Sequence, residues 1–182
     1  VAGMQGRIAM WHALGEAVAP LQLKTVSSNI FTHPEIATVG IGEATVDATD
    51  MDVRSVTLPL RTNARAKMAE LDDGFVKIYA RPTTGVVIGG VIVAPNASEL
   101  ILPVALAVTN NLTVNNLAET FAVYPSLSGS ITEAGRRLVQ HGDAEGGGVL
   151  HLLEQDLAGG GAALELPRQR ADAALQEVVP QV

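Results

Sequence analysis

The sequence contains no cysteine. Disulfide bonds, cysteine-ligated metal sites and thiol catalysis are therefore excluded for this chain. Aromatic residues make up only 3% of the 182 residues, whereas 47% of the residues are hydrophobic. A chain of this size and composition can bury a substantial core. We expect that core to be built from valine, isoleucine, leucine and alanine.

Other absences exclude classes of partner. No apolar stretch approaches the roughly 20 residues that a membrane-spanning helix needs, so we expect no membrane span. The net charge of −7 disfavours binding to nucleic acid or to an anionic membrane surface. None of the histidines has a partner at a spacing typical of metal ligands, and we expect no metal site. These histidines are His12, His33, His141 and His151.

The first residues lack the layout of a secretory signal peptide, because Arg7, His12 and Glu16 interrupt the apolar stretch. We therefore expect a cytoplasmic protein. The chain also begins within a helical pattern that no capping residue precedes. For this reason we expect it to be part of a longer protein.

Hydrophobic periodicity predicts the secondary structure. Apolar residues three and four positions apart predict a first helix over 4–18, ending before Pro20. Alternating patterns predict strands, and the segments that carry them are 22–30, 31–44, 52–60, 75–80 and 85–94. Gly89 and Gly90 within the last of these strands indicate a bulge or a close backbone contact.

A helix is predicted over 96–111 and another over 131–139. Asn96 and Glu99 have the spacing of a capping box, and Pro103 is expected to kink the helix without ending it. Strands thus cluster in the middle of the chain, and helices flank them. The predicted fold class is α+β, a mostly antiparallel sheet of about five strands with helices packed on one face.

The composition changes after Gln140. Residues 141–182 contain two Gly-Gly-Gly runs, Gly146–Gly148 and Gly159–Gly161, and no aromatic residue. Glycine triplets raise the entropy lost on ordering. We therefore predict a low-complexity, disordered tail over 141–182.

The stretch FAVYPSLSGS, residues 121–130, reads as a turn at Tyr124-Pro125 followed by small hydroxyl and glycine residues. Such a turn is suited to hold a catalytic group, yet this one contains no acid, histidine, cysteine or lysine. Gly40 and Gly42 in VGIGEA lack the third glycine of a dinucleotide fingerprint and precede no clear helix. The residues alone therefore predict no self-sufficient active site.

Several segments, taken together and in order, resemble one family. They are FTHPEIATVG at 31–40, NARA at 63–66, GFVKIYA at 74–80 and GVVIGGVIVAPNASELI at 85–101. They resemble the C-terminal dimerisation domain of the pyridine nucleotide-disulfide oxidoreductases, the family of dihydrolipoamide dehydrogenase and glutathione reductase. The resemblance covers 21–140. Residues 1–20 resemble the last helix of the family's FAD-binding domain, so the chain resembles the C-terminal third of a flavoenzyme.

The resemblance gives the turn a meaning. In this family the turn carries His-Pro and, four residues past the proline, Glu, and this pair serves as the acid-base partner of redox thiols across a dimer. Here Tyr124 replaces the His, Gly129 replaces the Glu, and Pro125 is retained. A phenol is a poor base at neutral pH, but it can donate a hydrogen bond. The resemblance further implies that Val1, Ala2, Tyr124 and Pro125 lie near FAD.

The altered turn favours the branch of the family that passes electrons from NAD(P)H through FAD to quinones. Two alternatives stay open: a non-catalytic dimerisation module and a disulfide reductase of the dihydrolipoamide dehydrogenase type. The resemblance implies a homodimer, attachment to the FAD and NAD domains of a flavoenzyme chain, and a quinone-type acceptor. FAD and NAD(P)H are expected in the complete protein. We expect this chain alone to bind neither cofactor and to be inactive.

Overall fold

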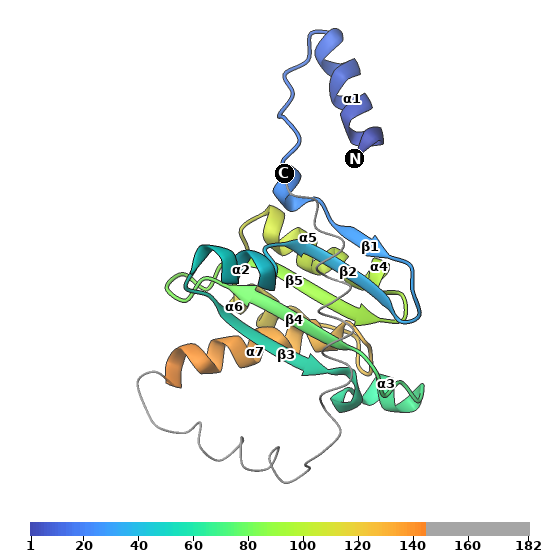
Figure 1. Cartoon of the computed structure of the whole chain (residues 1–182), viewed down its shortest axis with the longest axis vertical. Helices are drawn as coiled ribbons and strands as arrows, with labels where there is room; N and C mark the ends of the chain where they lie inside the picture. The colour runs from blue at the N-terminus through green and yellow to red at the C-terminus, as the bar shows by residue number, and fades with distance from the viewer. Residues whose placement is uncertain (145–182) are drawn as a thin grey trace.

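The computed structural model describes the backbone of residues 1–144 and the side chains of residues 1–140. Its centre is one antiparallel sheet with the strand order β1-β2-β5-β4-β3 (Figure 1). The strands are β1 Ser28–Ile30, β2 Glu35–Gly40, β3 Arg54–Pro59, β4 Phe75–Ala80 and β5 Val87–Ala94. The fifth strand in the sequence therefore occupies the middle of the sheet.

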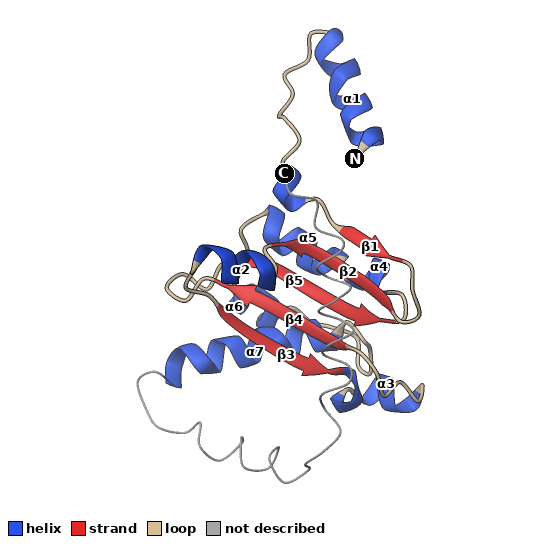
Figure 2. Ribbon diagram, viewed as in Figure 1, coloured by secondary structure: helices blue, strands red, loops and turns tan. Residues whose placement is uncertain are grey.

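The helices are α1 Ala2–Ala13, α2 Glu43–Thr49, α3 Ala64–Met68, α4 Ala97–Leu100, α5 Leu102–Thr109, α6 Val114–Glu119 and α7 Gly129–Ala144. Helix α5 packs against β5 and β2, while α7 packs against β3 and β4 and also against α6. Figure 2 shows α5 and α7 behind the sheet and α2 in front of it. The predicted α+β class, with an antiparallel sheet of five strands and its main helical layer on one face, is confirmed.

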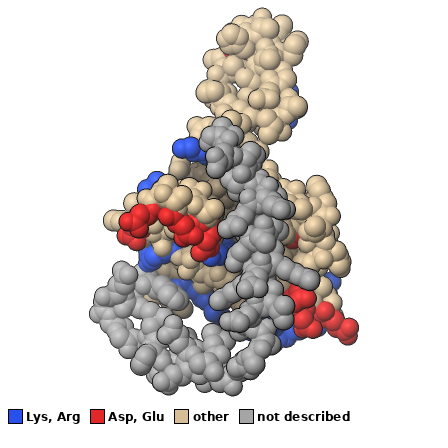
Figure 3. All heavy atoms as spheres, in the orientation of Figure 1, with Lys and Arg blue, Asp and Glu red and all other residues tan. Residues whose placement is uncertain are grey.

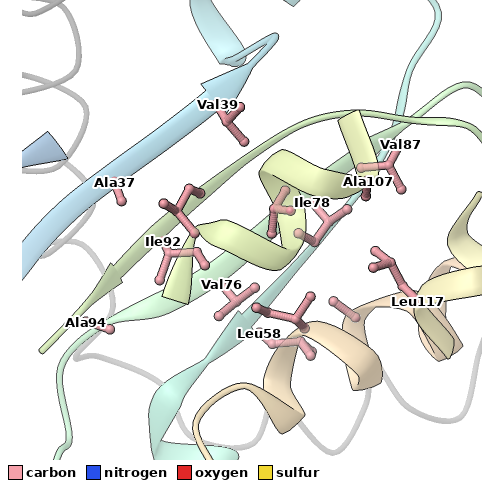
Figure 4. Close-up of a cluster of buried hydrophobic side chains, with 14 of the residues drawn as sticks. Ala37, Val39, Leu58, Val76, Ile78, Val87, Ile92, Ala94, Ala107 and Leu117 are labelled. Carbon is pink, nitrogen blue, oxygen red and sulfur yellow. The ribbon is translucent and has the colours of Figure 1, made fainter. Parts of the chain in front are cut away.

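The main hydrophobic core lies between the sheet and this helical layer. Alternate residues of the central strands point into it, among them Ile78 and Ile92 (Figure 4), and α7 contributes Ile131 and Leu138. All four side chains are almost completely buried. No aromatic residue belongs to this cluster, which confirms the predicted aliphatic core. Gly90 allows the close packing of α5, because a Cβ atom at this position would lie 2.8 Å from Val104 Cγ1.

The opposite face of the sheet carries a smaller cluster around Tyr79 and Val91, against which Val46 of α2 packs. Glu43 joins α2 to the sheet, because its carboxylate forms an ion pair with Lys77 and accepts a 2.9 Å hydrogen bond from the Tyr79 hydroxyl. The Lys77 hydrogen bond is the main cause that lowers the pKa of Glu43. Helix α2 begins at Glu43, within the VGIGEA segment, so the prediction that this segment precedes no clear helix was wrong.

Two other local predictions are corrected. The first helix ends at Ala13, not near residue 18, and Gly15 follows it with φ of 86°. The predicted strand over 22–30 is reduced to β1, preceded by a 3-10 turn at Leu23–Thr25. The bulge predicted beside Gly89 and Gly90 is confirmed, since the register of β5 against β4 shifts between Tyr79 and Ala80.

The predicted helix over 96–111 is divided into α4 and α5. The ring of Pro103 would clash with a helical carbonyl group four residues earlier, and proline has no backbone N–H to donate. The helix is therefore interrupted just before this proline, at Ile101. Asn96 has a left-handed backbone, with φ of 57°, and its side chain caps nothing. The predicted capping box at 96–99 is therefore wrong, while a capping box is present at Thr113 and Asn116, at the start of α6.

Charge is unevenly distributed over the surface. Figure 3 shows acidic side chains gathered over α2 and beyond the end of α3. The exposed residues there are Glu43, Asp47, Asp50, Glu70, Asp72 and Asp73. Such a face repels the phosphates of nucleic acid. Within residues 1–144, none of the helices combines the length and the apolar character needed to cross a bilayer.

The predicted tail over 141–182 lies almost entirely outside the described residues. Only the backbone of its first four positions is described, and there α7 continues as far as Ala144. The boundary near Gln140 therefore stays a prediction.

Candidate functional site

The turn at Tyr124-Pro125 lies in the connection between α6 and α7, and its peptide bond is cis. The side chains leading into it are highly exposed: Phe121 is 93% exposed, Val123 73% and Tyr124 84%. In the part of the chain that the structure describes, the Tyr124 hydroxyl has no hydrogen-bond partner. Apolar and aromatic groups that stay this exposed are typical of a surface that another molecule covers.

Asn63 anchors the turn from the side of α3. Its amide nitrogen donates to the Ser126 carbonyl oxygen at 2.9 Å and to the Ser130 hydroxyl at 2.8 Å. Its amide oxygen accepts from the backbone nitrogens of Arg65 at 2.8 Å and Ala66 at 3.3 Å, and so caps α3. One side chain thus connects the start of α3 to the turn and to the first turn of α7.

Hydroxyl groups order the start of α7. Ser126 Oγ accepts from the Gly129 amide at 3.1 Å and lies 3.0 Å from Ser128 Oγ. Thr132 Oγ1 donates to the Gly129 carbonyl at 3.0 Å. The residues after Pro125 therefore form a hydrogen-bonded unit, in which Ser130 and Thr132 are buried.

Gly129 leaves open space beside this unit. A Cβ atom built at Gly129 would meet only Ser126 Oγ, at an ordinary contact distance of 3.6 Å. No steric demand therefore requires glycine at this position. The consequence is chemical: no side chain projects from the first residue of α7 toward Tyr124.

A groove of about 420 Å³ runs between the turn, α3 and α7. Tyr124, Asn63 and Gly129 line it, and further along α7 it is lined by Glu133, Arg136 and Arg137. Glu133 pairs with both arginines at 3.3 Å, so its carboxylate is already engaged one helical turn beyond Gly129. The groove presents the phenol of Tyr124 as a hydrogen-bonding group. Within residues 1–140, no group of three or more histidine, aspartate or glutamate side chains is arranged to hold a metal ion.

The residues predicted to lie near FAD are only partly brought together. Tyr124 and Pro125 both line the groove. Val1 and Ala2 lie at the start of α1, which has no buried residue and stands away from the sheet (Figure 1), and no residue of α1 lines the groove. The two pairs are therefore separated within a single chain.

The sequence analysis missed the role of Asn63, Ser126 and Ser130. Asn63 was noted only as part of the NARA segment. An asparagine directly before a short helix is a signal for a helix cap. That signal predicts the two hydrogen bonds that the amide oxygen accepts from α3. The two hydrogen bonds that the amide nitrogen donates depend on residues more than 60 positions away, which no local sequence pattern includes.

Comparison with known proteins identifies a family. A family model described as "Pyridine nucleotide-disulphide oxidoreductase, dimerisation domain" matches residues 26–135. Over 145 residues the chain is 65% identical to a Mycobacterium tuberculosis protein named "NAD(P)H dehydrogenase (quinone)", covering 80% of this chain and 29% of the relative. It is 37% identical over 134 residues to the "Dihydrolipoyl dehydrogenase" of Haloferax volcanii, and this match covers 74% of this chain and 28% of the relative.

Solved structures agree on the fold. The crystal structure of LpdA from Mycobacterium tuberculosis superposes with a TM-score of 0.73 at 67% identity, over 76% of this chain and 30% of that chain. The flavoprotein disulfide reductase RclA from Escherichia coli superposes with a TM-score of 0.66 at 24% identity, over 71% and 30%; this second likeness concerns the fold alone. The chain thus spans less than a third of the length of the relatives that it matches.

Proposed function

The chain belongs to the pyridine nucleotide-disulphide oxidoreductase family and contains the dimerisation domain of that family, and we propose that it is part of an FAD-dependent NAD(P)H oxidoreductase that reduces quinones. The observation that carries the proposal is the turn itself. Tyr124 presents an exposed phenol, and Gly129 presents no side chain. The name of the Mycobacterium tuberculosis relative, at 65% identity, supports the same activity.

The chemistry of the turn suits a quinone better than a disulfide. Disulfide exchange requires a base that deprotonates a thiol, and neither a phenol nor a glycine supplies one at neutral pH. A quinone instead accepts electrons at a ring that carries two carbonyl oxygens. The Tyr124 hydroxyl can donate a hydrogen bond to such an oxygen and stabilise the negative charge that develops there.

Val1 and Ala2, two of the residues expected near FAD, lie apart from the groove. We assign FAD and NAD(P)H binding to the rest of the complete protein, where the two cofactors would supply the electrons. Two tasks then belong to this chain: association with a second copy, and presentation of the Tyr124 turn to that copy.

The proposed homodimer surface combines α5 with the Tyr124 turn. Leu102 and Leu106 lie one turn apart on α5 and are 60% and 51% exposed, and Phe121 and Val123 add further apolar area. Obligate interfaces of this kind bury on the order of 2,000 Å² or more. A second copy is the occupant that the family's dimerisation domain implies.

The remaining assignments follow from the same proposal. Residues 1–20 would form the last helix of the FAD-binding domain, and the exposed Met4 and Trp11 of α1 are suited to pack against that domain. Residues 21–140 would form the dimerisation domain. The proposed location is the cytoplasm.

A second candidate is a disulfide reductase, which the 37% identity to the Haloferax volcanii dihydrolipoyl dehydrogenase favours. The Gly129 position argues against it, because no carboxylate there can orient a base. A non-catalytic dimerisation module is the third candidate.

The complete gene product separates the three candidates. It should retain FAD through gel filtration and reduce a water-soluble benzoquinone with NADH or NADPH as donor, while dihydrolipoamide turnover stays negligible. Robust dihydrolipoamide turnover would establish the disulfide reductase instead. A preparation without flavin and without either activity would leave dimerisation as the only function.

A further inference from the structure

Asn63 uses the full hydrogen-bonding capacity of its side chain. The amide oxygen accepts two hydrogen bonds from the backbone of α3, and the amide nitrogen donates one to the Ser126 carbonyl and one to the Ser130 hydroxyl. Asparagine offers two acceptor positions and two donors, so none is left over. A side chain that is satisfied from two directions holds both partners in one geometry.

The cap of α3 does not explain why this residue is asparagine. Serine, threonine and aspartate cap helices about as well, because capping requires only an acceptor oxygen. Only the amide supplies acceptors for α3 and, at the same time, two donors for the turn. The identity of Asn63 is therefore explained by the turn that contains Tyr124.

The anchored atoms lie close to Tyr124 along the chain. Ser126 is two residues beyond it, and Ser130 belongs to the first turn of α7. Tyr124 itself forms no hydrogen bond within the described residues and is 84% exposed, so its position depends on the backbone of the turn. Because Ser130 is buried, losing the Asn63 donor would leave a buried hydroxyl without this partner.

We propose that Asn63 is a positioning residue, which fixes the Tyr124 turn and thereby the place where the phenol meets a bound acceptor. This inference rests on the proposed quinone reduction for its effect on turnover. Catalysis is sensitive to small displacements, since a shift of about 1 Å can lower a rate by roughly 100-fold. Loss of two hydrogen bonds at the base of the turn should therefore lower turnover measurably.

The test is Asn63→Asp in the complete flavoenzyme. Aspartate keeps the acceptor oxygen for α3 but loses both donors, and it places a charged oxygen against the Ser126 carbonyl. We expect kcat for benzoquinone reduction to fall about 10-fold. Flavin reduction by NAD(P)H should be unchanged, because the turn takes no part in that half-reaction.

A double-mutant cycle distinguishes positioning from general damage. In the Tyr124→Phe background the hydroxyl is already missing, so Asn63→Asp should change kcat by less than about 2-fold. A purely structural role would lower kcat equally in both backgrounds, and that result would overturn the inference.

Asn116→Asp is the matched control. Asn116 Oδ1 accepts from the Thr113 amide at 2.8 Å and from the Thr113 hydroxyl at 2.9 Å in the cap of α6, and its amide nitrogen has no partner among the described residues. The same chemical change should therefore leave turnover unaffected. If Asn116→Asp lowered kcat as much as Asn63→Asp does, the altered helix caps alone would explain the effect.

Amide hydrogen exchange in the 182-residue chain provides a readout that does not need the reaction. Asn63→Asp should accelerate exchange at Gly129 and Ser130 about 10-fold, and Asn116→Asp should not. Unchanged exchange at both amides would overturn the inference whatever the activity shows. If the parent enzyme reduces no quinone, the proposed function fails, and the exchange data alone decide whether Asn63 fixes the turn.

Discussion

A single carboxylate oxygen of Glu35, on β2, receives two hydrogen bonds from Ser98, on α4. Oε2 of Glu35 lies 2.9 Å from the Ser98 amide nitrogen and 2.7 Å from its hydroxyl oxygen. The backbone hydrogen bond, followed by the hydroxyl, holds the pKa of Glu35 below its ordinary value. Since Asn96 provides no side-chain cap for α4, a strand residue provides the acceptor instead.

This pair predicts a pH dependence of stability. A carboxylate whose pKa is lower in the folded protein stabilises it above the unfolded value, near 4.5, and the stabilisation is lost as the pH falls through the folded pKa. Glu35→Gln should therefore be less stable than the parent at pH 7, and the gap should narrow as the pH falls below about 4.5.

Urea denaturation between pH 3 and pH 7 measures this gap. Glu99→Gln, on the same helix, is the control, because the Glu99 side chain makes no hydrogen bond to another described residue. Parallel pH profiles of the parent and Glu35→Gln would contradict the prediction.

Tyr124→Phe in the complete flavoenzyme should lower benzoquinone turnover about 10-fold, the effect of one hydrogen bond of about 1.4 kcal/mol. The ring and its exposure are kept, so the dimer should form normally. Steady-state kinetics with quinone, beside stopped-flow measurement of flavin reduction, separate the two half-reactions. An unaffected variant would reduce Tyr124 to a spacer at the subunit boundary.

Two glycines of α7 should respond in opposite ways to alanine. At Gly135 the new Cβ would lie 2.9 Å from Leu117 Cβ and 3.0 Å from the Val114 carbonyl oxygen of α6. Overpacking of this kind costs roughly 1–3 kcal/mol. At Gly129 there is space, and alanine should be neutral or should stabilise by up to about 1 kcal/mol, because it favours the helix.

Thermal and urea unfolding of the two variants test this contrast, each variant serving as the control for the other. Equal effects at the two positions would show that α6 and α7 are not packed as closely as the structure places them.

Leu106→Glu should weaken the proposed homodimer. Twofold symmetry introduces the charge twice, and burying an unpaired charge costs several kcal/mol, so the dissociation constant should rise about 100-fold or more. Ala48→Glu is the control, because it adds the same charge to an exposed position of α2 on the other face of the sheet. Sedimentation equilibrium at micromolar concentration distinguishes the outcomes, and a folded monomer in the parent would remove the dimer from the proposal.

The elements that could be predicted are those whose residues alternate between two environments. In β4, Val76 and Ile78 face the main core, while Tyr79 faces the smaller cluster, and this alternation is visible in the sequence. Helix α2 has no such pattern, because Val46 is its one apolar side chain packed against the smaller cluster on the sheet. A helix of seven residues with one apolar contact leaves no detectable period.

The candidate site divides in the same way. The altered turn could be recognised at Tyr124 and Gly129, because both lie in one continuous segment that resembles a known one. The hydrogen bonds from Asn63 to the turn could not be recognised, since Ser126 and Ser130 lie 63 and 67 positions away in the sequence. The position of Val1 and Ala2 near FAD stays a prediction.

The place of β5 in the sheet has a consequence for synthesis in the cell. Strand pairs β3-β4 and β1-β2 become neighbours only through β5, which is the last of the five described strands to leave the ribosome. Until residue 94 has emerged, both pairs expose the edges that β5 will occupy, and such edges promote association between nascent chains. We therefore expect the sheet to close late in synthesis, and the chain to be most exposed to association before that point.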